Sequence, residues 1–135
     1  MSKSLAFAAL GMWAMLAVLD YLWLSTATKW LYRPRLGHLL SEQLVWPPAL
    51  LFYLLYGVGL LAFVLRPALQ DGSGLLAVFL WGALFGLVAY GTYDLTNHAT
   101  LRDWPLAVTA VDMAWGALLS GTASVAGVWL ARKFG

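Results

Sequence analysis

Three aspartates interrupt the most apolar stretches of this sequence. Asp20, Asp94 and Asp112 stand inside long hydrophobic runs, whereas the other three acidic residues stand in polar segments. An aspartate at the centre of a membrane helix costs roughly 2.5 to 3.5 kcal/mol on insertion scales, so each must face protein, water or a partner. A carboxyl group held there can carry a proton, attract a cation or accept hydrogen bonds that fix helix packing.

Aromatic and polar residues accompany the aspartates at helical spacing. Tyr90, Asp94 and Asn97 follow an i, i+4, i+7 pattern, which predicts one stripe of a helix, with Tyr93 beside it. The motif Asp-x-x-Trp occurs at Asp20 and again at Asp112, and the second apolar run supplies two tyrosines. The candidate ligand or proton site therefore comprises ten residues: Asp20, Trp23, Tyr53, Tyr56, Tyr90, Tyr93, Asp94, Asn97, Asp112 and Trp115.

The three aspartates are expected at one depth. Asp20, Asp94 and Asp112 lie seven to nine residues from the basic residue or proline that bounds each run on the side of the first and third loops. At a rise of 1.5 Å per residue these separations correspond to depths of about 10 to 14 Å. We therefore expect a single pocket of carboxylates rimmed by tyrosine hydroxyls and indoles, open toward those loops.

Composition places the chain in a lipid environment. The 135 residues are 62% hydrophobic and 10% charged, with a mean hydropathy of +0.78, whereas soluble domains carry about 25% charged residues. A net charge of +2 does not indicate nucleic-acid binding. The absence of cysteine excludes disulfides and thiolate metal sites. Since the two histidines lack the usual spacing of metal ligands, we predict neither a metal nor a cofactor.

The apolar runs predict an all-α, integral membrane four-helix up-down bundle with an amphipathic interfacial segment between helices 1 and 2. The whole chain, residues 1–135, forms a single transmembrane domain in this interpretation, with approximate spans at 5–27, 47–65, 75–97 and 105–130. Each span approaches the roughly 20 residues needed to cross a bilayer. Short loops make neighbouring spans antiparallel, so both termini are expected on one side.

The segments between the spans suggest helix ends. Residues 29–43 are basic and amphipathic, and we expect Pro34 to prevent a continuous helix, so that this segment lies along the interface. Arg66 and Pro67 are expected to end the second helix. Ser73 is a candidate N-cap for the third. Four tryptophans near the ends of the runs are expected in the interfacial belt: Trp30, Trp46, Trp104 and Trp129.

Small residues at four-residue spacing predict close helix contacts. These are the pairs Gly82 and Gly86, Ala117 and Gly121, and Ala123 and Gly127. The contacts could lie inside the bundle or between copies of the chain. Lysines and arginines are balanced between the two sides, so the positive-inside rule assigns no orientation.

Two strings carry a resemblance to a known family. Tyr93-Asp94-Leu95-Thr96-Asn97, with Val111-Asp112-x-Ala114-Trp115 downstream, resembles a family of small bacterial predicted membrane proteins of unknown function. The likeness covers nearly the whole chain. It implies a four-span fold in the bacterial inner (cytoplasmic) membrane and no established activity. Small multidrug exporters share the architecture of four short spans with a buried acid in the first, but no motif of theirs is present, so that comparison is analogy.

Several functions fit these residues. The leading hypothesis is a protein that binds or transports a small cationic or amphipathic ligand, with proton release from an aspartate coupled to binding. An intramembrane enzyme acting on a lipid or isoprenoid ranks below it, because no nucleophile, cofactor or phosphate loop is identified. A non-catalytic subunit or assembly factor that docks a membrane partner is the third. The aspartates could also be purely structural and fix helix register.

Overall fold

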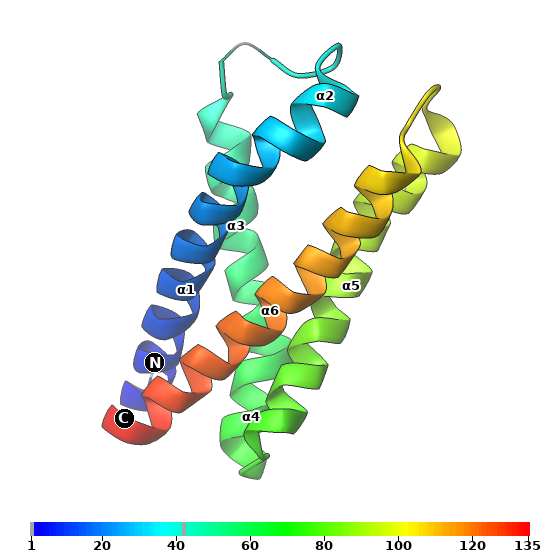
Figure 1. Ribbon diagram of the computed structural model, residues 1–135. Coiled ribbons are helices and arrows are strands. Elements are labelled where there is room, and N and C mark those ends of the chain that lie inside the picture. Colours follow the sequence, from blue (N-terminus) through cyan, green and yellow to red (C-terminus); the bar gives the residue numbers. More distant parts are fainter. Residues whose placement is uncertain (1, 42) are drawn as a thin grey trace.

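The computed structural model shows a bundle of four long helices (Figure 1) and describes residues 2–41 and 43–135. The elements are α1 (Lys3–Ala27), the π-helical turn η1 (Thr28–Tyr32), α2 (Arg33–Leu36), α3 (Trp46–Leu60), the π-helical turn η2 (Leu61–Leu65), α4 (Arg66–Asp71), α5 (Leu75–Thr100) and α6 (Leu106–Phe134). They join into four continuous helices that are each long and apolar enough to cross a membrane. Within the described residues there is no strand, and the predicted all-α four-helix architecture is confirmed.

Helix α6 is the centre of the bundle. It packs along its length against α5 on one side and α1 on the other, and it buries the largest share of its side chains. Both termini lie at the same end (Figure 1), as expected for an up-down arrangement. Helix α3 is attached more loosely. The Trp13 indole of α1 packs over Gly57 and donates a hydrogen bond to the Tyr53 carbonyl, with an N···O distance of 3.2 Å.

The small-residue seams lie inside the bundle. A Cβ atom added at Gly82 would stand 2.8 Å from the Ser120 carbonyl oxygen, and one added at Gly86 would meet the Gly116 carbonyl. Glycine therefore permits the backbones of α5 and α6 to approach closely. Gly127 plays the same part between α6 and α1, because a Cβ atom there would lie 2.6 Å from the Ala8 carbonyl oxygen. These seams fix the positions of α1 and α5 relative to α6.

Pro34 does not interrupt the first helix, so the predicted break at this residue is wrong. Proline lacks the N–H that would bond to the carbonyl four residues earlier, and its ring crowds that carbonyl. The preceding turn, Thr28–Tyr32, is π-helical and relieves the crowding. Pro34 has no N–H to donate to the Trp30 carbonyl. That carbonyl accepts a hydrogen bond from the Arg35 guanidinium, with an N···O distance of 3.2 Å. Glu42, in the following connection, lies outside the described residues.

The second helix also continues through a proline, Pro67, after a π-helical turn. The predicted helix end at Arg66 and Pro67 is therefore wrong. The turn Leu61–Leu65 is π-helical, and α4 continues to Asp71. Gly72 then terminates the helix at φ 68°, a left-handed conformation that glycine adopts readily. Gly74 rather than Ser73 occupies the N-cap of α5. Arg132 ties this turn to α6, since its guanidinium donates to the Ser73 carbonyl at 2.5 Å.

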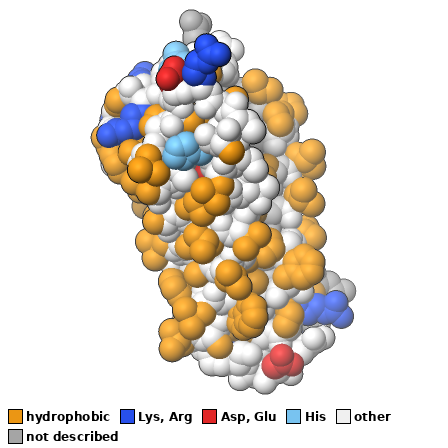
Figure 2. All heavy atoms as spheres, turned by 90° about the vertical axis from the view of Figure 1, so that its right-hand side faces the viewer, with side chains coloured by type: hydrophobic (Ala, Val, Ile, Leu, Met, Phe, Trp, Pro, Cys, Tyr) orange, Lys and Arg blue, Asp and Glu red, His pale blue; other side chains and the backbone are white. Residues whose placement is uncertain are grey.

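The outer surface is apolar over the middle of the bundle. On the face shown in Figure 2, hydrophobic side chains cover the centre, and charged side chains gather toward the two ends. Trp30, Trp46 and Trp129 are exposed near helix ends, as interfacial tryptophans would be. Trp104 is not exposed. It is buried between α5 and α6, so its assignment to the belt is wrong.

Candidate functional site

A cavity of about 730 Å³ lies between α1, α3, α5 and α6, in the half of the bundle nearer the 37–45 connection. All four long helices contribute to its wall. The described lining residues are Asp20, Trp23, Leu24, Tyr32, Leu44, Val45, Pro48, Ala49, Phe52, Tyr53, Ala89, Tyr90, Tyr93, Asp112 and Trp115. Most of this surface is apolar or aromatic, and two carboxyl groups provide its acidic chemistry. Sites for small molecules commonly combine a few polar groups with an apolar wall in this manner.

The two acidic groups of the cavity bridge α1 and α6. Asp20 of α1 accepts a hydrogen bond from the Trp115 indole of α6, with an N···O distance of 3.4 Å. Asp112 of α6 accepts from the Tyr32 hydroxyl in η1, and that hydroxyl accepts in turn from the Trp23 indole at 3.0 Å. Each helix therefore presents an aspartate to a donor on the other.

The repeated Asp-x-x-Trp motif is the basis of this bridge. The Trp23 and Trp115 rings stack with their centroids 4.6 Å apart and their planes 9° from parallel. Because α1 and α6 run in opposite directions, the two copies of the motif meet head to tail. The stacked indoles form one wall of the cavity. They hold both carboxyl groups on the same side of the α1–α6 contact.

Asp94 occupies a different environment. Its side chain is fully buried, and neither carboxyl oxygen has a hydrogen-bond partner among the described residues. It lies close to Asp112 across the α5–α6 contact. Burying a polar group without a hydrogen bond costs about 1 to 3 kcal/mol in proteins, and a lone charge costs far more. Burial of Asp94 thus costs folding free energy. The residue lies beside the cavity but does not line it.

The structure brings together seven of the ten predicted site residues. Asp94, Asn97 and Tyr56 are outside the cavity lining. Tyr56 lies deeper, where its hydroxyl is hydrogen-bonded to Ser120 of α6 and its ring contacts Phe85. Asn97 is partly buried on α5, beyond Asp94. The seven that line the cavity are Asp20, Trp23, Tyr53, Tyr90, Tyr93, Asp112 and Trp115.

Comparison with known proteins identifies the family. Residues 5–129 match the model of a family described as predicted membrane protein (DUF2177). The chain belongs to this family. The match spans both strings on which the sequence resemblance rests, and with the four apolar helices it establishes a membrane protein with four candidate spans. No curated protein matches the chain, and no solved structure does.

Sequence reasoning missed Tyr32 in this DUF2177 protein. Nine residues separate Tyr32 from Trp23, which is roughly two and a half turns of a regular helix, so the two would point to opposite faces. The π-helical turn changes that register and brings the Tyr32 hydroxyl to both Trp23 and Asp112. Periodicity alone could not find this contact. Phe52 was also missed, because nothing in its spacing distinguishes it from the lipid-facing leucines around it.

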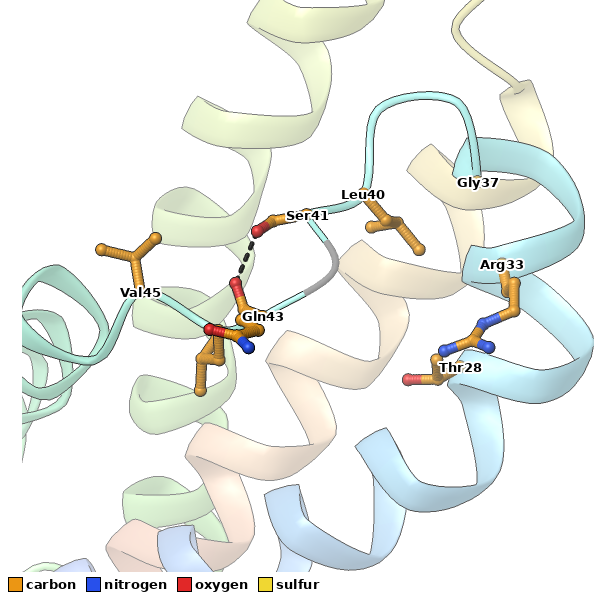
Figure 3. Close-up of a pocket in the computed structure, with 8 residues that line it drawn as sticks. Thr28, Arg33, Gly37, Leu40, Ser41, Gln43 and Val45 are labelled. Carbon is orange, nitrogen blue, oxygen red and sulfur yellow. Dashed lines mark hydrogen bonds between the residues drawn. The ribbon is translucent and has the colours of Figure 1, made fainter.

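A second, more open hollow of about 600 Å³ adjoins the acidic cavity (Figure 3). Arg33 and Thr28 of the first helix lie on one side of it, and Ser41 and Gln43 lie on the other, where the Ser41 hydroxyl donates to the Gln43 carbonyl at 2.5 Å. Leu44 and Val45 line both this hollow and the acidic cavity. The DUF2177 chain therefore has a basic side chain, Arg33, in the hollow next to its acidic cavity. Among the described residues, no three histidine, aspartate or glutamate side chains gather as a metal site requires.

Proposed function

We propose that the cavity binds a small amphipathic cation and that binding releases a proton from the buried aspartates. The observation that carries this proposal is the combination of Asp20 and Asp112 with aromatic rings in one wall. A carboxylate attracts a cation by charge, and the faces of tryptophan and tyrosine attract it through the ring quadrupole. The volume of about 730 Å³ suits a drug-sized molecule.

The mouth of the cavity supports an amphipathic rather than a fully water-soluble ligand. Leu24 and Phe52, from α1 and α3, are each about half exposed at 47%, and Leu44 and Val45 are each 61% exposed. In a bilayer these side chains face hydrocarbon or the headgroup boundary. A molecule with an apolar body would enter between α1 and α3 from the lipid and place its charged group beside Asp20.

Proton release follows from the position of Asp112 near both Asp20 and Asp94. Carboxyl groups that share a poorly solvated site hold a proton between them, because two adjacent negative charges repel. A bound cation supplies the opposite charge and replaces that proton. Asp94, which has no hydrogen-bond partner among the described residues and lies beside Asp112, is the natural holder of the proton.

Binding fits the geometry better than transport across the membrane. Below the cavity the bundle is closed by Met12, Leu16, Leu60 and Leu119, all of which are fully buried. A ligand held at Asp20 thus has access from one side only. The helical architecture and the family resemblance favour the bacterial inner membrane as the location, since outer-membrane spans are barrel strands.

Titration of the purified protein with tetraphenylphosphonium, a lipophilic cation, tests the proposal. We expect saturable binding in detergent, measured by calorimetry, with a fractional proton release measured in weakly buffered solution. Asp20→Asn should weaken binding at least about tenfold, which corresponds to 1.4 kcal/mol. The matched control is Asp71→Asn, which removes an exposed acid at the far end of α4. Equal affinity in both variants, with no proton released by the wild type, refutes the proposal.

A neutral probe of the same shape isolates the contribution of charge. Tetraphenylsilane replaces the charged phosphorus by silicon and keeps the four rings. If the carboxyl groups drive binding, the neutral probe binds far more weakly than the cation, and the Asp20→Asn variant no longer distinguishes the two. Retained tryptophan fluorescence in that variant shows that the Trp23–Trp115 stack is intact.

A further inference from the structure

His98 and Thr109 form a hydrogen-bonded contact between α5 and α6 that the cavity does not use. The His98 Nδ1 atom lies 3.1 Å from the Thr109 hydroxyl oxygen. The same hydroxyl accepts a hydrogen bond from the buried Trp104 indole at 3.0 Å. His98 itself is partly exposed at the end of α5. Its imidazole thus connects the surface of the protein to a buried polar contact.

This contact lies one helical turn from the two adjacent carboxyl groups. Asp94 precedes His98 by four residues on α5, and Asp112 follows Thr109 by three on α6, so the side chains are neighbours on each helix. The α5–α6 contact therefore carries two successive polar layers, His98 with Thr109 and Asp94 with Asp112. One layer reaches the surface and the other is buried.

The other ionisable groups around Asp94 belong to the ligand cavity. Asp94 is absent from the described cavity lining, and its side chain has no exposed surface. Toward the centre of the bundle, Tyr90 packs on Gly116, and Gly86 lies against the backbone of α6. The ionisable groups that face Asp94 are Asp112 from α6, Tyr32 from η1 and Tyr93 from its own helix. All three line the ligand cavity, so proton transfer through any of them would pass the ligand site.

We propose that His98 exchanges protons between the aqueous phase and the Asp94–Asp112 pair, by a route separate from the ligand cavity. The inference rests on the proposed function, in which the pair loses a proton when a cation binds. It adds the residue through which that proton leaves. A ligand could then occupy the cavity without blocking the proton's exit.

The proton transfer is balanced and involves no redox change. On release, the O–H bond of the Asp94 carboxyl group breaks and an N–H bond forms on the imidazole. The imidazolium then gives that proton to water and returns to its neutral form. Thr109 positions the ring. Its oxygen has two lone pairs and accepts both the Trp104 N–H and the Nδ1–H of His98. In this tautomer Nε2 has the free lone pair that takes up the exchanging proton.

Infrared spectroscopy measures the exchange directly. Protein in lipid nanodiscs is transferred to D₂O, and the shift of the C=O stretching band of protonated carboxyl groups is followed in time. Asp94→Asn should remove this band, which assigns it. His98→Gln should slow the shift by about a hundredfold, at the lower end of the contribution of a positioned proton-transfer group. His38→Gln, which changes an exposed histidine near the same end of the bundle, should leave the rate unchanged.

A second variant distinguishes a proton-transfer role of His98 from a structural role. In His98→Ala, millimolar imidazole added to the buffer should restore the exchange rate, whereas a purely structural histidine would not be replaced by a small molecule in this way. An unchanged rate in His98→Gln, or a band that survives Asp94→Asn, overturns the inference.

The equilibrium titration distinguishes failure of this inference from failure of the proposed function. His98→Gln should bind tetraphenylphosphonium with wild-type affinity and release the same number of protons, only more slowly. If the wild type binds the probe without proton release, the proposed function is refuted. The exchange rates still decide the role of His98 in that case, because they require no ligand.

Discussion

Gly86→Ala should destabilise the bundle, although alanine is the better helix former. The gain in helix propensity is at most about 1 kcal/mol. Against it, the added methyl group would overlap the Gly116 carbonyl and stand 2.7 Å from the Ser120 Cβ atom, so α5 and α6 must separate. Overpacking costs typically 1 to 3 kcal/mol, and a backbone carbonyl cannot rotate away. We expect a net loss of about 1 to 2 kcal/mol in unfolding free energy.

Gly91→Ala is the matched control on the same helix. Its added methyl group would meet only the flexible end of Met113, 3.0 Å away, which can move aside. This variant should be as stable as the wild type or slightly more stable. Both are measured by unfolding in mixed micelles with increasing dodecyl sulfate, followed by tryptophan fluorescence. If Gly86→Ala proves no less stable than Gly91→Ala, the close α5–α6 seam that positions Asp94 beside Asp112 is wrong.

Three further predictions concern the contacts around the cavity. Tyr32→Phe should lower the unfolding free energy by about 1 to 3 kcal/mol, because Asp112 loses its donor, whereas Tyr21→Phe, at an exposed ring, should change nothing measurable. Trp115→Phe should abolish the circular dichroism couplet of the stacked indoles and leave Asp20 without its donor, and Trp129→Phe should preserve the couplet. Arg132→Gln should accelerate amide hydrogen exchange in the turn between α4 and α5, since two carbonyls lose a donor; unchanged exchange would show that the turn holds without it.

Much of the site could be predicted because helical spacing and depth are properties of the sequence. Counting residues from the ends of the apolar runs predicted one depth for the three aspartates, and the structure brings Asp20 and Asp112 to one cavity with Asp94 beside it. The repeated Asp-x-x-Trp motif, by contrast, had no interpretation in the sequence. Its meaning depends on the antiparallel packing of α1 and α6, which stacks the two tryptophans.

The contacts of Tyr56, Asp94 and Tyr32 each depend on a feature that regular helical spacing does not give. Tyr53 and Tyr56 are one helical turn apart, and only Tyr53 lines the cavity, whereas Tyr56 lies deeper and is hydrogen-bonded to Ser120 of α6. Asp94 turns into the α5–α6 contact, because glycines draw those two helices together. Tyr32 depends on a π-helical turn before a proline, which a period of 3.6 residues does not represent.

The most direct test of the acidic cavity is a structure of the protein in lipid nanodiscs with bound tetraphenylarsonium, whose arsenic atom is located by its own scattering. We expect arsenic between the stacked indoles and α3, within ion-pair reach of Asp20, in the wild type and not in Asp20→Asn. Arsenic found elsewhere on the bundle, with the cavity filled by lipid or closed by its own side chains, would contradict it.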